Sequence, residues 1–367
     1  MAESPRLSSR AKWVALAVVA LLGSMVVLAT AEGSVRLRQW SKYGTTASYE
    51  GLYRIDEKIQ LRVLVPGAKI GNITINSSGF RGPGIEMPKP PGRIRLAFLG
   101  ASTTFCAEVR GDAAVWPSLV VEQLRGRFPQ AQFDFVNGGV PGYTVRLSIL
   151  NLQHLVDPLD PDLVVIYHAT IDLSGEVNQL AAEQGLTAAG GNRQNWMARH
   201  FLLWELVEKN LKVTGARRGA ESEAHRVVLD KVRVGTGFDQ DLRGLMELAG
   251  RDNRRVAVAT FSTQLRAEQT TEEKKRAAVS ALVYMPNMSL DILLFGYAKC
   301  NDIIRTVAGD RGALLIEGEN EIPGDAAHFV DAVHLNDAGS RKIAERVSAA
   351  LANDPAFIRL VESRQRH

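Results

Sequence analysis

Short apolar runs alternate with amphipathic stretches along the chain beyond residue 92. Five runs have the apolar, β-branched-rich composition of buried strands: Ile94–Leu99, Phe133–Asn137, Leu163–Tyr167, Arg255–Phe261 and Ala313–Glu317. Helical stretches are expected between and after them at Val115–Phe128, Thr144–Val156, Phe238–Gly250, Leu290–Ala308 and Asp337–Leu351. Strands that alternate with helices form parallel sheets buried on both faces, so the pattern predicts an α/β fold with helices on either side of a parallel sheet.

A run without charges, Trp13–Ala31, lies near the amino terminus and follows Arg6, Arg10 and Lys12. Its 19 residues come close to the about 20 that cross a hydrocarbon layer as a helix. The small residues at 29–31 also suit signal peptidase. We expect an uncleaved membrane anchor, with secretion after cleavage near Ala31 as the alternative. In either case the rest of the chain is expected on the exported side, periplasmic or extracellular.

The composition divides the chain into segments. A basic flank (1–12) and the apolar run (13–31) precede a membrane-proximal region, 32–92, with strand-like runs at Leu61–Val65 and Ile70–Ile75. That region ends in NSSGFRGPGIEMPKPPG, which is dense in glycine and proline and predicts a turn and an extended linker. A main domain is expected over 93–352 and a tail over 353–367. Within the domain, 173–254 is interpreted as an insertion that either caps a pocket or is a surface excursion.

Composition and charge narrow the function classes. The chain has 367 residues, of which 46% are hydrophobic and 23% charged, and its net charge is +4. Basic residues are scattered among acidic ones rather than gathered in a stripe with aromatics, which argues against nucleic-acid binding. Cys106 and Cys300 form no metal-binding pair, and two buried free thiols are favoured over a disulfide.

Polar and small residues follow the first and third predicted strands. After the first comes FLGASTTF, where Ser102 stands at the expected start of a helix. Such a serine can be a nucleophile whose own N–H stabilises an oxyanion, or simply the helix N-cap. Neither a P-loop nor a GxSxG elbow is present, and no cofactor is expected. After the third comes YHATID, with His168, Thr170 and Asp172 around Ile171.

Two further stretches contain candidate functional residues. The second strand is followed by VNGGVPGYT, whose Gly138-Gly139 pair permits close approach of the backbone and whose Thr144 is expected to cap the next helix. The segment before the last helix, HFVDAVHLNDAG, contains Asp331 and His334 three residues apart. A carboxylate at that spacing can orient an imidazole that acts as a base.

Two alternatives remain for the carboxyl-terminal segment. One is an ordinary surface Asp–His pair. The other is a metal site in which His328, Asp331 and His334 act as ligands together with His168 and Asp172, a mixture that suits zinc or manganese. No compact second cluster supports the metal, and none is assigned.

Together these blocks resemble the SGNH (GDSL-like) hydrolase superfamily over roughly residues 94–351. The resemblance implies a three-layer α/β/α, flavodoxin-like fold with a five-stranded parallel sheet. It also implies that Ser102 is the nucleophile, His334 the general base, Asp331 its orienting carboxylate, and Gly139 an N–H donor to the oxyanion. NSSGFRGP and the apolar amino-terminal run are similar to membrane-anchored bacterial members.

One block departs from the family pattern. The family's third motif, GxND, carries an oxyanion-binding asparagine, but Ala169 and Ile171 stand at the glycine and asparagine positions. The isoleucine side chain cannot donate a hydrogen bond. Asp172 keeps the family aspartate and is expected to brace the loop, and His168 is expected to support the site without acting as the base.

The sequence therefore predicts a serine esterase or acyl-hydrolase that acts on an exported acyl ester, with a weakened oxyanion hole. Two alternatives stay open: an O-acyltransferase that acts on an exported polysaccharide, and a catalytically impaired descendant that binds an acylated glycan or lipid. The expected partners are the acyl-ester substrate and the membrane.

Overall fold

The computed structural model describes residues 8–43, 49–186, 201–221, 227–228 and 231–365. These residues fall into two compact units. One consists of the described residues within 1–48 and 192–211, and the other holds the rest of the chain.

The first unit is built on α1, Ser9–Tyr43, and the first half of α7, Leu202–Glu221. The stretch Ser9–Ser41 of α1 is long and apolar enough to cross a membrane, as the run 13–31 predicts. The helix extends beyond that run at both ends, so residues 32–43 are helical rather than part of a mixed strand region.

The second unit contains a five-stranded parallel sheet in the order β6-β5-β7-β8-β9, which confirms the predicted flavodoxin-like fold. Its strands are β5 Arg93–Gly100, β6 Gln132–Gly139, β7 Leu163–Tyr167, β8 Arg255–Ala259 and β9 Leu314–Ile316. Strand β5 pairs with β6 over its whole length and with β7 from Leu96 to Gly100. All five predicted strands are present; each is a short apolar run, and β7 at the centre of the sheet is buried along its whole length.

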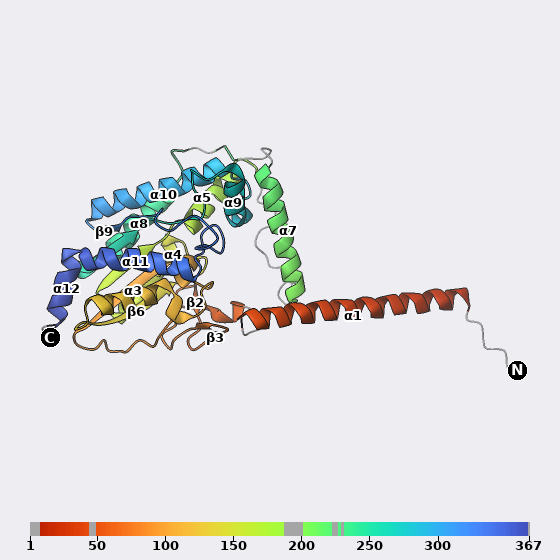
Figure 1. Ribbon diagram of the computed structural model, residues 1–367, viewed down its shortest axis with the longest axis horizontal. Coiled ribbons are helices and arrows are strands. Elements are labelled where there is room, and N and C mark those ends of the chain that lie inside the picture. Colours follow the sequence, from red (N-terminus) through yellow and green to blue (C-terminus); the bar gives the residue numbers. More distant parts are fainter. Residues whose placement is uncertain (1–7, 44–48, 187–200, 222–226, 229–230, 366–367) are drawn as a thin grey trace. The chain divides into compact units, whose positions relative to one another are not determined.

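Helices cover both faces of this sheet (Figure 1). One layer holds α3 Trp116–Arg127, α11 Asp337–Asn353 and α12 Pro355–Gln365. The other holds α4 Val145–Asn151, α5 Thr170–Glu183, α8 Thr236–Ala249 and α10 Leu290–Arg311, with α9 Thr271–Tyr284 packed on α10. The predicted helix over 144–156 changes after Asn151 into a wider π turn, Leu152–Val156, and Thr144 caps it as expected.

Two small antiparallel hairpins precede the sheet. They pair β1 Tyr53–Asp56 with β2 Leu61–Leu64, and β3 Lys69–Ile70 with β4 Ile73–Thr74. The expected strand over 70–75 is thus divided by a turn at Gly71, whose φ of 58° lies in the left-handed region. The apolar side chains of the hairpins share a core with Phe105, Val140 and Tyr143, which lie beside the carboxyl edge of the sheet.

Three helices were not expected from the sequence. α5 begins at Thr170, within the polar stretch after the third strand, and continues into the segment interpreted as an insertion. α9 begins with a capping box between Thr270 and Glu273. α12 occupies most of the expected tail and buries Phe357 and Val361. Residues 187–200, 222–226 and 229–230 of the segment interpreted as an insertion lie outside the described residues.

Candidate active site

Three neighbouring strands end at one edge of the sheet, and the sequence blocks follow directly from them. Ser102 comes after β5, Gly139 ends β6, and Ile171 lies in the first turn of α5 after β7. Because β5 lies between β6 and β7, the parallel register brings these three segments to the same edge.

Ser102 opens a four-residue helix, α2, Ser102–Phe105. The N-cap position is taken by Ala101, which makes no side-chain capping bond, so Ser102 is not the helix cap that the sequence allowed as an alternative. Its hydroxyl instead lies 2.7 Å from Nε2 of His334.

Side chains from distant parts of the chain hold the carboxyl end of α2. The Trp116 indole N–H donates to the Thr103 carbonyl at 3.1 Å, and the Asn137 amide donates to the Thr104 carbonyl at 3.2 Å. A helix leaves its last carbonyls without internal partners, and here other elements supply them. The position of Ser102 is therefore set by the surrounding core rather than by its own short helix.

Arg81, from the NSSGFRGP segment, completes this support. Its Nη1 donates to the carbonyls of Phe105 at 2.9 Å and Cys106 at 2.5 Å, and its Nε pairs with Asp112 at 2.8 Å. The guanidinium also lies over the Phe105 ring. This arginine is almost completely buried, and no motif in the sequence indicates its role.

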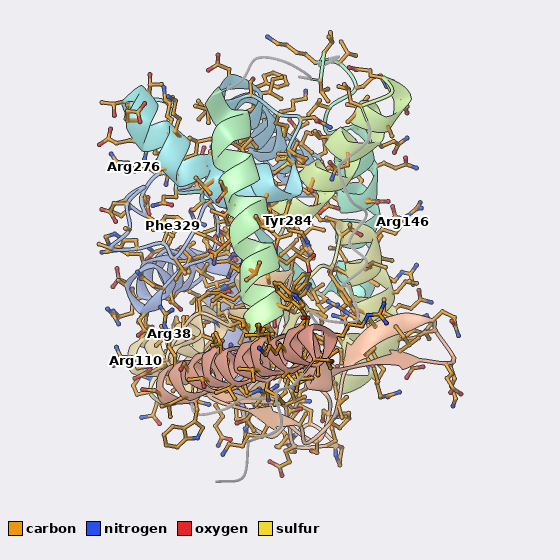
Figure 2. The ribbon with its side chains drawn as sticks, turned by 90° about the vertical axis from the view of Figure 1, so that its right-hand side faces the viewer. Arg38, Arg110, Arg146, Arg276, Tyr284 and Phe329 are labelled. Carbon is orange, nitrogen blue, oxygen red and sulfur yellow. The ribbon has the colours of Figure 1, made fainter. Side chains whose placement is uncertain are left out.

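Asp331 and His334 lie on a tight turn closed by a β-bridge between Phe329 and Leu335. The turn can be followed from Phe329, which is labelled in Figure 2. One oxygen of Asp331 accepts the backbone N–H groups of Val333 and His334, at 3.0 and 2.9 Å. Both its oxygens lie within 3.0 Å of Nδ1 of His334, so the three-residue spacing does place the carboxylate against the ring.

The pKa shifts of Asp331 and His334 indicate which atoms carry the protons in the contacts from Asp331 through His334 to Ser102. Burial alone would raise the pKa of Asp331, but the hydrogen bond and charge of His334, with the two backbone N–H donors, lower it overall. Asp331 is therefore an ionised acceptor and Nδ1 of His334 the donor. The neutral ring then has its lone pair on Nε2, which can accept the Ser102 proton.

Burial would lower the pKa of His334, but the hydrogen bond to Asp331 and the negative charges of Glu108 and Asp331 raise it to about 8. A general base must be unprotonated, so we expect kcat/KM to rise with pH and level off above about pH 8. Glu108→Gln removes one of the charges that stabilise the imidazolium, and the midpoint should move to lower pH. The pH profile of ester hydrolysis measures this shift.

Glu122→Gln, on the exposed side of α3, is the matched control and should leave the profile in place. Because Glu108 is exposed to solvent, added salt should reduce the difference between the Glu108 variant and the wild type. A Glu108→Gln profile that coincides with the wild type at low salt would contradict this role.

Gly139, the last residue of β6, packs closely against α2. A Cβ atom at Gly139 would lie 2.5 Å from the Phe105 nitrogen, so the close approach of α2 requires glycine. Its N–H donates to the side-chain oxygen of Asn137 at 3.1 Å. Gly142 in the following loop is exposed, has a left-handed φ of 84°, and has no acceptor for its N–H among the described residues.

Ile171, at the position of the family asparagine, has no side-chain hydrogen-bond donor. Ile171 is half-buried in the first turn of α5. The hydroxyl of the adjacent Thr170 lies 3.0 Å from the hydroxyl of Tyr297 in α10. That contact engages the threonine with the neighbouring helix.

His168 and Asp172 belong to a second, buried Ser–His–Asp group. Nε2 of His168 lies 2.8 Å from the hydroxyl of Ser148, and Nδ1 is 3.9 Å from Asp172. Burial lowers the pKa of His168 to about 3 and raises that of Asp172 to about 7. Asp172 accepts the N–H of Val145 at 2.9 Å and so ties the start of α5 to α4, in agreement with a bracing role.

The residues considered for a metal do not gather around one point. Nδ1 of His328 lies 2.8 Å from Asp325, whereas His334 contacts Asp331. Among the described residues, no group of three or more His, Cys, Asp or Glu side chains is placed to hold a metal ion. Cys106 and Cys300 are both buried and free.

A protein-family model for the GDSL-like lipase/acylhydrolase family matches residues 98–342, which include every block of the site. The chain belongs to this family. It is accordingly a hydrolase of ester bonds. No curated protein matches the chain.

Several solved structures are similar to the chain at low sequence identity. An acetylxylan esterase, Axe2 from Geobacillus stearothermophilus, is 16% identical with a TM-score of 0.43 over 71% of this chain and 94% of that one. The acetyl xylan esterase AlAXEase gives 16% identity and a TM-score of 0.41 over 70% and 99% of the two chains. An α/β hydrolase, LAE5 from the metagenome of Lake Arreo, gives 19% identity and a TM-score of 0.40 over 70% and 94%.

Arg81 should affect turnover without contacting substrate. In Arg81→Lys a single ammonium replaces the fork that binds two carbonyls and Asp112, so α2 should be held less firmly. Misplacement of a reacting group by about 1 Å can cost about 100-fold, and we expect kcat to fall about 10- to 100-fold with little change in KM. Steady-state hydrolysis of an activated ester measures both constants.

Arg95→Lys is the matched control. Arg95 is equally buried and binds Asp134 through Nε and Nη2, each at 2.8 Å, but it lies near the amino end of β5, away from Ser102. Both variants should lower the melting temperature, and only Arg81→Lys should lower kcat. Equal kcat in the two variants would mean that Arg81 has a structural role alone.

Proposed function

We propose that the chain is a serine esterase in which Ser102 is the nucleophile, His334 the general base and Asp331 the residue that orients it. The observation that carries the proposal is the continuous contact from Ser102 Oγ to His334 Nε2, at 2.7 Å, and from His334 Nδ1 to Asp331, at 2.9 Å. These distances are already within hydrogen-bond reach without substrate.

The reaction follows from these contacts. Nε2 of His334 takes the Ser102 proton as Oγ attacks the acyl carbonyl, and Asp331 stabilises the imidazolium that forms. The imidazolium then gives its proton to the leaving alcohol, and an acyl-serine remains. Water, deprotonated by the same ring, attacks the acyl-serine and releases the carboxylic acid, with the proton returned to Ser102.

The tetrahedral oxyanion needs donors at the start of α2 and in the loop after β6. We assign the first to the N–H of Ser102. The second is the N–H of Gly142, because Gly139 already donates to Asn137. With Ile171 at the asparagine position the hole has two backbone donors and lacks the side-chain donor, so we expect a lower rate than with an asparagine there.

The substrate that we propose is an acyl ester met on the exported side of a membrane, with α1 as the anchor. The test is hydrolysis of a series of p-nitrophenyl esters by the full-length chain, with and without an oligosaccharide acceptor. An esterase releases free acid at a rate that the acceptor and a metal chelator leave unchanged. Acyl transfer to the acceptor would indicate an acyltransferase, and loss of activity with chelator would indicate metal-dependent hydrolysis.

A further inference from the structure

The first half of α7 exposes an apolar surface. Between residues 202 and 211, the sequence LLWELVEKNL places Leu203, Val207 and Leu211 at i, i+4 and i+8, on one side of the helix. Glu205, Glu208 and Lys209 lie on the other side. Leu211 is 67% exposed and Val207 41%, although both belong to the apolar side.

Aromatic side chains lie at the amino end of this surface. Trp204 is 39% exposed and Phe201, just before the helix, 43%. We call the exposed apolar side chains of this half of the helix the α7 apolar surface; its members are Trp204, Leu206, Val207 and Leu211. A wide apolar side opposite charged residues is typical of helices that lie in a membrane–water interface.

The start of α7 is fixed to α1 within the same compact unit. The carboxylate of Glu32 accepts the N–H of Leu202 at 3.1 Å and of Leu203 at 2.8 Å, and Arg36 donates to the same carboxylate at 2.7 Å. Glu32 thus supplies both the acceptors and the negative charge that a helix amino terminus favours.

The place of Glu32 along α1 indicates what covers the α7 apolar surface. Glu32 is the first charged residue after the run 13–31, whose length matches the hydrocarbon thickness of a bilayer. If that run spans the bilayer, Glu32 lies at the boundary between hydrocarbon and headgroups. The hydrogen bonds to Leu202 and Leu203 then hold the first turn of α7 at the same depth, where tryptophan is enriched.

We propose that residues 202–211 of α7 bind the surface of the lipid bilayer, with the α7 apolar surface in the acyl-chain boundary and Glu205, Glu208 and Lys209 toward water. This proposal rests on the membrane anchoring of α1 proposed above. The chain would then contact the membrane at two segments that are far apart in sequence, and the Glu32 contacts would join them.

The test places an environment-sensitive fluorophore at single sites in the full-length chain, reconstituted into vesicles of phosphatidylcholine and phosphatidylglycerol. The sites are made by Val207→Cys and Leu211→Cys on the apolar side, with Lys209→Cys as the matched control on the same helix. Val19→Cys, within α1, reports the anchor separately. Cys106 and Cys300 are buried, and labelling of the wild type measures any background from them.

We expect labels at Val207 and Leu211 to shift to shorter emission wavelengths and to be quenched by lipids brominated near the headgroup end of the acyl chain. Quenching there should exceed that at Lys209 about threefold, since the polar side of an interfacial helix faces water. Glu32→Gln should reduce the difference, because the charge that caps α7 is lost.

Three results would overturn the proposal. A label at Val19 that is quenched while those at Val207 and Leu211 are not would show that the anchor inserts and α7 stays off the membrane. A blue shift at Val207 and Leu211 without quenching would show that protein, such as a second copy of the chain, covers the surface. An unquenched label at Val19 would show that α1 does not insert into the bilayer. The proposal for α7 depends on that insertion and would fail with it.

Discussion

Replacement of the nucleophile, Ser102→Ala, is expected to lower kcat for ester hydrolysis by about 10⁴- to 10⁶-fold, the loss seen when one member of such a unit is removed. The change deletes the only atom of Ser102 that lies within reach of His334, 2.7 Å from Nε2. It leaves the backbone N–H groups of α2 in place, and the variant should therefore still bind substrate. Steady-state kinetics with p-nitrophenyl acetate measure the loss.

His334→Ala should cost about as much as Ser102→Ala, and the double variant little more, because the two residues act as one unit. Ser148→Ala is the matched control. Ser148 also contacts a histidine, at 2.8 Å, but it is completely buried in the His168 group. Its loss should lower the melting temperature without removing activity. Full activity in Ser102→Ala would contradict the assignment of the nucleophile.

The second large expected effect is an increase in kcat. Ile171→Asn returns an amide donor to the first turn of α5, at the sheet edge that also carries Ser102. One oxyanion donor contributes about 10²–10³ in turnover in enzymes adapted to it, and we expect an increase of about 10- to 100-fold here. The increase should appear in kcat rather than KM, because the donor acts on the charge that develops in the transition state.

Ile171→Val controls for the loss of side-chain volume without adding a donor, and it should leave kcat close to the wild type. If Ile171→Asn is no faster than Ile171→Val, then residue 171 does not reach the oxyanion. In that case the oxyanion hole would consist only of the two backbone donors assigned to Ser102 and Gly142.

The sheet could be predicted from the sequence because its signals are local. Each strand is a short apolar run, and the rules of parallel connections limit which strands lie next to one another in the sheet. The pairing of Asp331 with His334 is equally local, since three residues separate them and the turn itself brings them together.

α5 was missed although its pattern is present in the sequence. Leu173, Val177, Leu180 and Ala181 follow the i, i+4, i+7, i+8 spacing of a buried helix side. The helix begins with polar residues directly after a strand, so its first turn has the composition of a loop. α12 carries a weaker signal of the same kind, with Phe357 and Val361 one turn apart after Pro355.

The support of the nucleophile could not be predicted, because it depends on contacts between distant positions. Arg81 reaches Phe105 and Asp112, which lie 24 and 31 residues further along the chain. The use of the Gly139 N–H by Asn137 is closer in sequence, at two residues, but it requires a specific side-chain rotamer. Sequence spacing identifies which residue types are available and leaves their orientation open.

The most direct test of the account is covalent labelling with a serine-directed fluorophosphonate, followed by mapping of the modified peptide by mass spectrometry. The account predicts one adduct, on Ser102, which forms in the folded wild type, slows by orders of magnitude in His334→Ala and is absent after denaturation. An unreactive wild-type chain, an adduct on another serine, or a rate that His334→Ala leaves unchanged would contradict it.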